Sequence, residues 1–348
     1  MNNKIWIPQS NAKPLINQTR FSDLDFSNKR LNCDDLTNYT PKWLIPNFIL
    51  KNTLISFYAM PGSGKSITAL FLGAYLLANN LISKIYYIDA DNGFATLKNR
   101  GLEQMLSTYK DSLVYICFAK KSNDDIDKRK LLFDLAQDKN QGLNDTILII
   151  DSIRNFIAGN MSYDSDVMPL LDALQAIRDY SAGVWFLNHQ SKQSFANQGE
   201  NNKAYKGATA FFDSPDEAYF INKKERNDST IILTAEPMKQ RDDTKPMAII
   251  IDTANQTLNF EDYDLYSIND KQDISLQYAK QIIKENNKGI NLKSLVDEIK
   301  RRAKIDDNAQ ICGSNALKAL LKKFGNKLYM MQNSNASYNS LVFKPFSY

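Results

Sequence analysis

The most informative stretch of the chain reads Ala59-Met60-Pro61-Gly62-Ser63-Gly64-Lys65-Ser66. It follows an apolar run, Leu54–Tyr58, and precedes a helical pattern that begins at Ile67. Glycines at this spacing let the backbone wrap closely around phosphate groups, and the start of the next helix adds the positive end of its dipole. A strand, such a loop and a helix in that order form the context of a P-loop. The stretch therefore predicts a nucleotide site at the end of a buried strand.

Specific roles follow from the chemistry of this loop. Lys65 is expected to contact the β- and γ-phosphates of ATP, and Ser66 to ligate Mg²⁺. A second Mg²⁺ ligand is expected at a strand end, and Asp151 directly follows the apolar run Ile147–Ile150. Taken alone, Asp151 could instead cap the next helix. The predicted ligands are ATP and Mg²⁺, and the predicted nucleotide-binding residues of the loop are Gly62, Ser63, Gly64, Lys65, Ser66 and Ile67.

The fold class follows from short runs that are apolar on both faces of a strand. Such runs are buried parallel strands when helical patterns alternate with them, as at 67–78 and 167–180. The sequence therefore predicts an α/β fold with a largely parallel, twisted sheet flanked by helices. The parallel strands are expected at 54–58, 85–88, 114–118, 147–150 and 184–187. Alternating segments predict antiparallel strands that complete the sheet at 218–222, 230–234, 247–252 and 257–260.

Changes in composition divide the chain into four parts. We expect an N-terminal arm (1–40), an α/β domain (41–260), an acidic linker (261–272) and a small C-terminal domain (273–348). The last part predicts helices at 274–285, 292–303 and 308–324, and a hairpin of strands 328–332 and 340–344. Three helices and a β-hairpin are typical of a winged-helix-like domain.

Charge is distributed unevenly between these parts. Residues 273–348 carry 11 Lys and 2 Arg against 4 Asp and 2 Glu, a net charge of +7, whereas the whole chain carries +4. A basic module on a mildly acidic body indicates DNA as a partner, with Lys318, Lys322 and Lys323 on the third helix. The alternative is a basic surface that is merely solvated.

The overall composition excludes several classes of protein. The chain has 348 residues, 24% charged and 43% hydrophobic, which excludes a disordered or collagen-like chain. Cys33, Cys117 and Cys312 are too scattered for a disulfide framework or a metal site and predict reduced thiols in a cytoplasmic protein. No apolar run near the N-terminus has the length of a signal peptide or a membrane span, so no membrane partner is expected.

From Thr40 to Phe260 the layout resembles the RecA-like ATPases, in particular the hexameric replicative helicases of the plasmid RepA and DnaB types. The segment before the first parallel strand, Trp43-Leu44-Ile45-Pro46-Asn47-Phe48, resembles that of the RepA-like group. The resemblance implies an ATP hydrolase that acts as a DNA helicase or translocase in the replication of a plasmid, phage or other mobile element. It also implies a homo-oligomer, a hexameric ring with ATP hydrolysed at the subunit interfaces.

The resemblance assigns further residues to the nucleotide site. In this family a carboxylate after the second strand polarises the attacking water, and Asp91 matches the family's Glu. The shorter side chain is expected to slow hydrolysis, and Asp89 is the competing candidate. Arg100 matches a RepA-like position near the adenine, the alternative being an arginine on a helix surface. His189, at the end of the fifth strand, matches a residue that senses the γ-phosphate, the alternative being a structural histidine.

Two more elements are assigned by the resemblance. The polar loop 191–206 would face the ring channel and bind single-stranded DNA through Lys192, Phe195, Lys203 and Lys206, unless it is only a surface loop. The acidic loop 158–166 is a weaker DNA candidate.

The stretch 236–242 resembles the Lys-x-Arg element of DnaB-type helicases, in which Lys239 and Arg241 would reach a neighbour's γ-phosphate. Two surface cations are the alternative. The competing functions are a filament-forming recombinase and a nucleotide-switched DNA-binding regulator without unwinding activity.

Overall fold

The structure is a computed structural model that describes residues 30–120, 127–137, 142–190, 207–241, 243–306, 309–333 and 341–346. It divides into two units, 1–42 and 43–348. Residues 1–29 of the expected N-terminal arm lie outside the described residues. The described part of the first unit holds a short helix, α1 (Cys33–Thr37), which a capping box between Asn32 and Asp35 begins.

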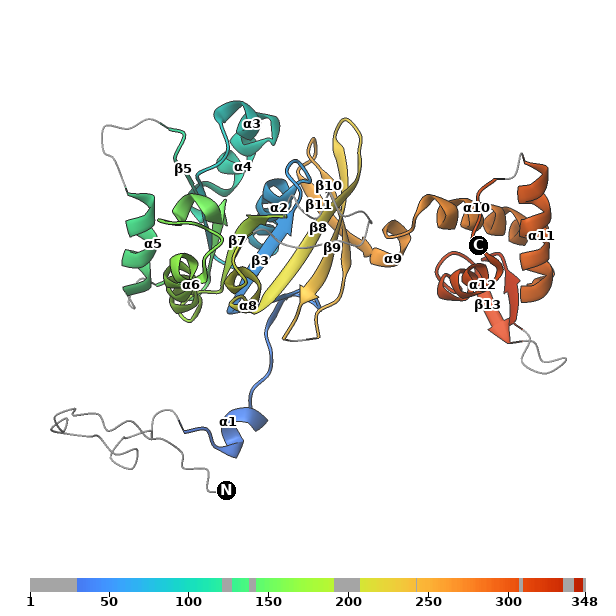
Figure 1. The fold of residues 1–348 in the computed structure, drawn as a ribbon, viewed down its shortest axis with the longest axis horizontal. Helices are drawn as coiled ribbons and strands as arrows, with labels where there is room; N and C mark the ends of the chain where they lie inside the picture. The colour runs from blue at the N-terminus through green and yellow to red at the C-terminus, as the bar shows by residue number, and fades with distance from the viewer. Residues whose placement is uncertain are drawn as a thin grey trace, which may run out of the picture. The chain divides into compact units, whose positions relative to one another are not determined.

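The second unit is built on a nine-stranded sheet, counted over the described residues (Figure 1). Its strand order is β11-β10-β9-β8-β3-β7-β6-β4-β5. The strands are β3 (Thr53–Ala59), β4 (Lys84–Asp89), β5 (Leu113–Cys117), β6 (Thr146–Asp151), β7 (Gly183–His189), β8 (Glu217–Arg226), β9 (Thr230–Lys239), β10 (Met247–Asp252) and β11 (Thr257–Asp262). A separate two-stranded ribbon, β1 (Trp43–Ile45) and β2 (Ile49–Leu50), precedes the sheet in sequence. The α/β fold with a largely parallel sheet is confirmed.

The direction of one strand differs from the prediction. The segment 218–222 was expected to be antiparallel, but β8 pairs in parallel with β3, from Ile55 opposite Glu217 to Tyr58 opposite Phe220. β7 ends at His189, and β8 begins at Glu217 after α8 (Ala210–Asp213); both strands run parallel to β3, so the connection between them crosses from one end of the sheet to the other. Such a crossover produces a parallel pair. β9, β10 and β11 are antiparallel to their neighbours, as predicted.

Helices cover both faces of the sheet, as the continuous apolar strands require. Along β6, Ile147 and Ile149 pack into the core beneath α2, and the alternate residues Leu148 and Ile150 pack into the core beneath α6. All four are at most 4% exposed. The helices of this part are α2 (Lys65–Ala78), α3 (Phe94–Asn99), α4 (Leu102–Tyr109), α5 (Lys128–Gln137) and α6 (Asp164–Arg178). Burial on both faces fixes the strand ends that carry the candidate site.

The C-terminal residues form their own core around Leu295, Ile299, Leu317 and Phe343. Its elements are α10 (Asp270–Glu285), β12 (Ile290–Asn291), α11 (Leu292–Ile305), α12 (Ser314–Lys323), β13 (Met330–Asn333) and β14 (Leu341–Lys344). The three helices and the hairpin strands were predicted, although the third helix begins at Ser314 and not at 308. β12 was not predicted, and it pairs with β14 in a sheet of order β12-β14-β13. The winged-helix assignment itself stays a prediction.

The acidic stretch 261–272, expected as a linker, has regular structure along most of its length. It contains the end of β11, the helix α9 (Tyr263–Tyr266) and the first residues of α10. Lys327 forms ion pairs with Asp262 and Asp264, each at 2.6 Å, and Lys323 pairs with Asp264 at 2.8 Å. The acidic residues therefore bind lysines of the C-terminal part, which explains why the stretch is ordered.

None of the helices in the described residues combines the length and the apolar character that crossing a membrane requires.

Candidate functional site

The loop between β3 and α2 has the backbone of a phosphate cradle. Gly62 and Gly64 have φ angles of +75° and +90°, a region that glycine enters without a steric cost. A Cβ atom on Gly64 would also lie 2.8 Å from Leu233 Cδ2 of β9, so a side chain there would force Leu233 to shift. The turn therefore favours glycine at both positions, and the close approach of β9 adds a second reason at Gly64 only.

The start of α2 supplies donors for an anion. The helix begins at Lys65, and Gly64 at its N-cap provides no side-chain hydrogen bond. The first N–H groups of a helix lack partners within the helix, and they carry the positive end of its dipole. These groups, which include the N–H of Ile67, fit a phosphate. The side chain of Ile67 is 7% exposed and belongs to the core, so only its backbone can serve the site.

Lys65 is held inside the loop. Its side chain is buried, and Nζ donates to the carbonyl oxygens of Ala59 at 3.3 Å and Met60 at 3.2 Å. Burial lowers the pKa of Lys65 to about 8, although the negative charges of Asp151 and Asp91 act to raise it. A phosphate at the cradle would raise this pKa again, because a nearby negative charge favours the charged form of the ammonium group.

Asp151 ends β6 beside the P-loop and is 2% exposed. It accepts hydrogen bonds from Tyr87 Oη at 2.9 Å and Asn92 Nδ2 at 3.0 Å. Burial raises the pKa of Asp151, and a hydrogen bond with Ser66 acts in the opposite direction. A hydroxyl group and a carboxylate in contact are oxygen ligands of the kind that Mg²⁺ prefers together with phosphate and water. The pair expected to hold the metal, Ser66 and Asp151, is thus brought together.

Asp89 and Asp91 have different environments. Asp89 is 1% exposed and accepts from the N–H groups of Asp91 and Asn92, both at 2.9 Å. It also accepts from Tyr115 Oη at 2.6 Å. The side chain of Asp91 is 32% exposed and meets Arg154 Nη2 at 3.4 Å. Asp89 therefore organises the turn, and Asp91 is the accessible carboxylate.

Three polar residues of this network were missed by the sequence analysis. Asn92 Nδ2 donates to both Asp89, at 3.1 Å, and Asp151, at 3.0 Å, so one amide links the two buried carboxylates. The rings of Tyr87 and Tyr115 stack with centroids 4.7 Å apart. Burial raises the pKa of both tyrosines, which keeps them protonated as donors. The available signal was the position of Asn92 in the turn after the strand and of the tyrosines on strands.

Lys223 of β8 was also missed. Its Nζ donates to the carbonyl of Gly62 at 3.3 Å, which brings a second cation to the P-loop. In the sequence it is one of several charged residues in 223–226, and nothing local distinguishes it.

His189 and Arg100 lie in different parts of the site. His189 ends β7 in register with Ala59, directly at the start of the loop. Arg100 follows α3 and lies near the carboxylate network. Burial is the main cause of the raised pKa of Asp151, and the positive charge of Arg100 acts to lower it. The structure therefore brings His189 to the phosphate end of the site, and Arg100 to the side of the acids.

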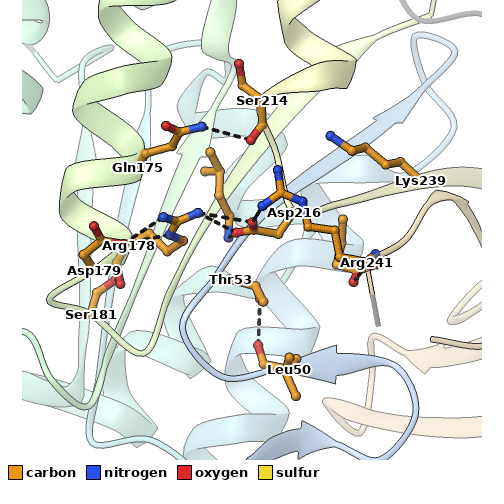
Figure 2. Close-up of polar contacts among 12 residues, drawn as sticks. Leu50, Thr53, Gln175, Arg178, Asp179, Ser181, Ser214, Asp216, Lys239 and Arg241 are labelled. Carbon is orange, nitrogen blue, oxygen red and sulfur yellow. Dashed lines mark hydrogen bonds and ion pairs between the residues drawn. The ribbon is translucent and has the colours of Figure 1, made fainter. Parts of the chain in front are cut away.

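Lys239 and Arg241 lie near Asp216 (Figure 2). Lys239 pairs with Ala218 at the beginning of β8, which runs parallel to β3, so the pair is at the end of the sheet opposite the P-loop. Arg241 Nη1 contacts Asp216 Oδ1 at 2.7 Å, and Asp216 in turn accepts from the N–H of Leu54, near the beginning of β3. The P-loop starts after Ala59, at the opposite end of that strand. About 17 Å of strand separates Leu54 from Ala59 at the usual rise per residue. The pair is therefore not part of the P-loop site of its own chain.

Two loops were expected to contact DNA. The loop 191–206, with Lys192, Phe195, Lys203 and Lys206, lies outside the described residues. In the loop 158–166, Asp166 accepts from the N–H of Asn160 at 2.7 Å. Asp164, at the start of α6, accepts from the N–H of Ala210 at 3.0 Å. These acids are therefore engaged by backbone groups.

The mostly parallel sheet, the loop between β3 and α2 and the buried acid at the end of β6 together resemble the nucleotide site of RecA-like P-loop ATPases. Residues 25–194 match a protein family described as an AAA domain. No curated protein matches the chain by sequence.

Solved structures show likeness at low sequence identity. One that is described as an ATPase domain is 14% identical, with 60% of this chain and 84% of that chain covered and a TM-score of 0.45. A DnaB-like replicative helicase, in a structure that also concerns its interactions with primase, is 12% identical and has a TM-score of 0.47. The match covers 63% of this chain and 64% of that chain. The flagellar accessory protein FlaH from Methanocaldococcus jannaschii is 14% identical, with 63% and 92% covered and a TM-score of 0.37.

Proposed function

We propose that the protein is an ATP-dependent DNA translocase of the replicative helicase type, which hydrolyses ATP between the subunits of a hexameric ring. The observation that carries the proposal is the place of Lys239 and Arg241, at the end of the sheet opposite the P-loop of their own chain. Cations that stabilise the transferred phosphoryl group must stand within a few ångströms of it. If these two act in catalysis, they act on a nucleotide bound to a neighbouring copy.

Within one chain, the residues at the strand ends would have different roles in ATP hydrolysis. The N–H groups after Gly64 and the Lys65 ammonium would bind the phosphates, and Ser66 with Asp151 would hold Mg²⁺. When bound, the metal would supply positive charge that offsets the negative charge of the phosphates. Asp91 would accept a proton from the attacking water, because it is the carboxylate with solvent access. His189, in register with Ala59, would report the state of the γ-phosphate to the loop that follows.

The DNA part of the proposal rests on the C-terminal charge and on exposed lysines. Lys318 and Lys322 are exposed on α12, and residues 273–348 carry a net charge of +7. Lys323 is already paired with Asp264 at 2.8 Å, so its charge is partly neutralised and would attract DNA less strongly. We propose that this winged-helix-like part binds duplex DNA through phosphate contacts, and that the loop 191–206 binds the single strand.

The test is ATP turnover with and without single-stranded DNA, combined with strand displacement from a forked duplex. Stimulation of ATPase together with ATP-dependent displacement is expected. Electron microscopy of the protein with a non-hydrolysable ATP analogue is expected to show closed rings. Filaments would instead support a recombinase.

One observation favours the second candidate, a nucleotide-switched DNA-binding regulator. Asp91 is a methylene shorter than the family's Glu, and Arg154 lies 3.4 Å from its carboxylate. Both features disfavour fast hydrolysis because the carboxylate must reach the water as a base. DNA binding that responds to ATP, with no strand displacement and turnover unaffected by DNA, would favour this candidate.

A further inference from the structure

Asp216 stands between Arg178 and Arg241 (Figure 2). It contacts Leu54 near the beginning of β3, at the end of the sheet far from the P-loop. Its side chain is 10% exposed, and its Oδ2 accepts from the Leu54 N–H at 2.9 Å. Arg178 Nη1, from the end of α6, reaches its two oxygens at 3.2 and 2.9 Å. Arg241 Nη1 meets Oδ1 at 2.7 Å. A strand backbone and a helix side chain therefore fix the carboxylate that Arg241 contacts.

Arg241 is held from two directions. Its backbone N–H donates to Glu217 Oε1 at 3.3 Å, and Glu217 is fully buried. The other carboxylate oxygen of Glu217 accepts from Thr244 Oγ1 at 3.1 Å, which fastens the same loop further along. The side chain of Arg241 is nevertheless 55% exposed. Among the described residues, only the Nη1 atom of its guanidinium contacts another side chain. A guanidinium has five N–H donors, so the remaining ones can bind a second anion.

We propose that Asp216 is a positioning residue for Arg241, which it holds ready to meet the γ-phosphate of a nucleotide bound to a neighbouring copy of the chain. The inference rests on the proposed function, since it requires Arg241 to act between subunits. An arginine that is ordered before the nucleotide arrives loses little rotamer entropy when the transition state forms. The carboxylate fixes the direction of the guanidinium plane, and the outward N–H groups make the contact.

The charge arrangement fits this role. A carboxylate beside a cation would weaken the cation's field at a phosphate if the acid had no other partner. Here Arg178 contacts both oxygens of Asp216, so the negative charge is shared between two guanidinium groups. Arg241 therefore keeps a positive field on its exposed side. Lys239, whose pKa is lowered by burial and by the charge of Arg241, adds a second cation close by.

The first experiment is the substitution Asp216→Asn in the full-length protein. We expect kcat to fall about 10- to 100-fold, the scale of a displaced catalytic group. The Kd for ATP should be unchanged, because the P-loop lies at the other end of the strand. Asp179→Asn is the matched control: Asp179 contacts the same Arg178 at 2.8 Å, is 60% exposed, and has no contact with Arg241 among the described residues. The double variant Asp216→Asn/Arg241→Ala should be no slower than Arg241→Ala alone.

A mixing experiment separates positioning from a folding defect. An Asp216→Asn chain has a sound P-loop, so mixing it with Lys65→Ala, whose Arg241 is sound, should restore part of the ATPase activity. Mixing it with Arg241→Ala should restore none. Recovery in neither mixture would overturn the proposal, because Asp216 would then support its own P-loop structurally. Recovery in both, or an unchanged kcat, would also overturn it. If Arg241→Ala itself keeps full turnover, the proposed function fails instead.

Discussion

Asp89 and Asp91 are separated by one residue but differ in access, since Asp89 is 1% exposed and the Asp91 side chain is 32% exposed. β4 ends at Asp89, and the chain then turns around its carboxylate, which accepts the N–H groups of the next residues. An attacking water has little access to a buried carboxylate whose oxygens already accept several hydrogen bonds, whereas it can approach an accessible one.

Asp91→Asn is therefore expected to leave ATP affinity intact and to lower kcat by about 10²-fold or more, because the base is lost while the volume is kept. Asp89→Asn should instead lower the thermal midpoint, since an amide cannot accept all the bonds that Asp89 accepts. Steady-state kinetics and thermal denaturation of both variants test the pair. If Asp89→Asn lost turnover at full stability while Asp91→Asn stayed active, the two roles would be reversed.

Lys65→Ala should abolish ATP hydrolysis and weaken ATP binding, because it removes the ammonium group that the P-loop encloses. Fluorescent nucleotide titration and phosphate release give the two quantities. Lys223→Ala is a useful comparison, since Lys223 also touches the loop but is exposed, and its loss should have a smaller effect. Full turnover in Lys65→Ala would contradict the nucleotide site itself.

Arg241→Ala should keep ATP affinity and lose about 10³-fold or more in turnover, the scale known for arginine fingers. Turnover of the unaltered protein should rise with its concentration through the range in which subunits assemble. Mixing Arg241→Ala with Lys65→Ala should restore part of the activity, because one composite site then has both a sound P-loop and a sound arginine. No recovery from chains that demonstrably co-assemble would mean that Arg241 does not act between subunits.

Duplex DNA binding should depend on the exposed cations of α12. Lys318→Ala/Lys322→Ala is expected to weaken binding and to reduce the slope of log K against log salt concentration by about 2, one for each phosphate contact. Lys323→Ala is the control, since its Nζ is already paired with Asp264. Removal of residues 273–348 should weaken duplex binding further while ATPase activity persists. An unchanged salt slope in the double variant would identify α12 as a merely solvated surface.

The affinity for ATP should depend on pH through Lys65, whose pKa burial lowers to about 8. Below that pH the ammonium is present before ATP arrives. Above it the free protein has lost the proton and must take one up on binding, because the phosphates favour the charged form. The Kd should therefore rise up to about tenfold per pH unit above that value. Calorimetry near pH 9 in two buffers of different ionisation enthalpy should detect proton uptake, and a Kd that is flat with pH would contradict it.

Much of the parallel sheet and its phosphate cradle is encoded locally. Apolar runs such as 147–150 indicate buried strands because both faces of a parallel strand must avoid water. The glycines at 62 and 64 mark the cradle because their φ angles are positive. The role of Asp151 as a candidate Mg²⁺ ligand was predicted from its position at the end of an apolar strand. In each case neighbours in sequence are also neighbours in space, so a short pattern is sufficient.

Other features depend on which distant segments meet. Strand alternation places Asp89 and Asp91 on one face, but β4 ends at Asp89 and the turn reorients Asp91, an outcome that depends on Tyr115 and Asn92 as donors. The direction of β8 depends on a crossover through α8.

Asp216 contacts Arg178, which lies 38 residues before it in sequence, and Arg241, which lies 25 residues after it. A buried charge must pair with whichever groups the packed sheet brings close to it, and the distance between such groups cannot be read from their spacing in the sequence. The tertiary structure alone therefore decided where Arg241 lies.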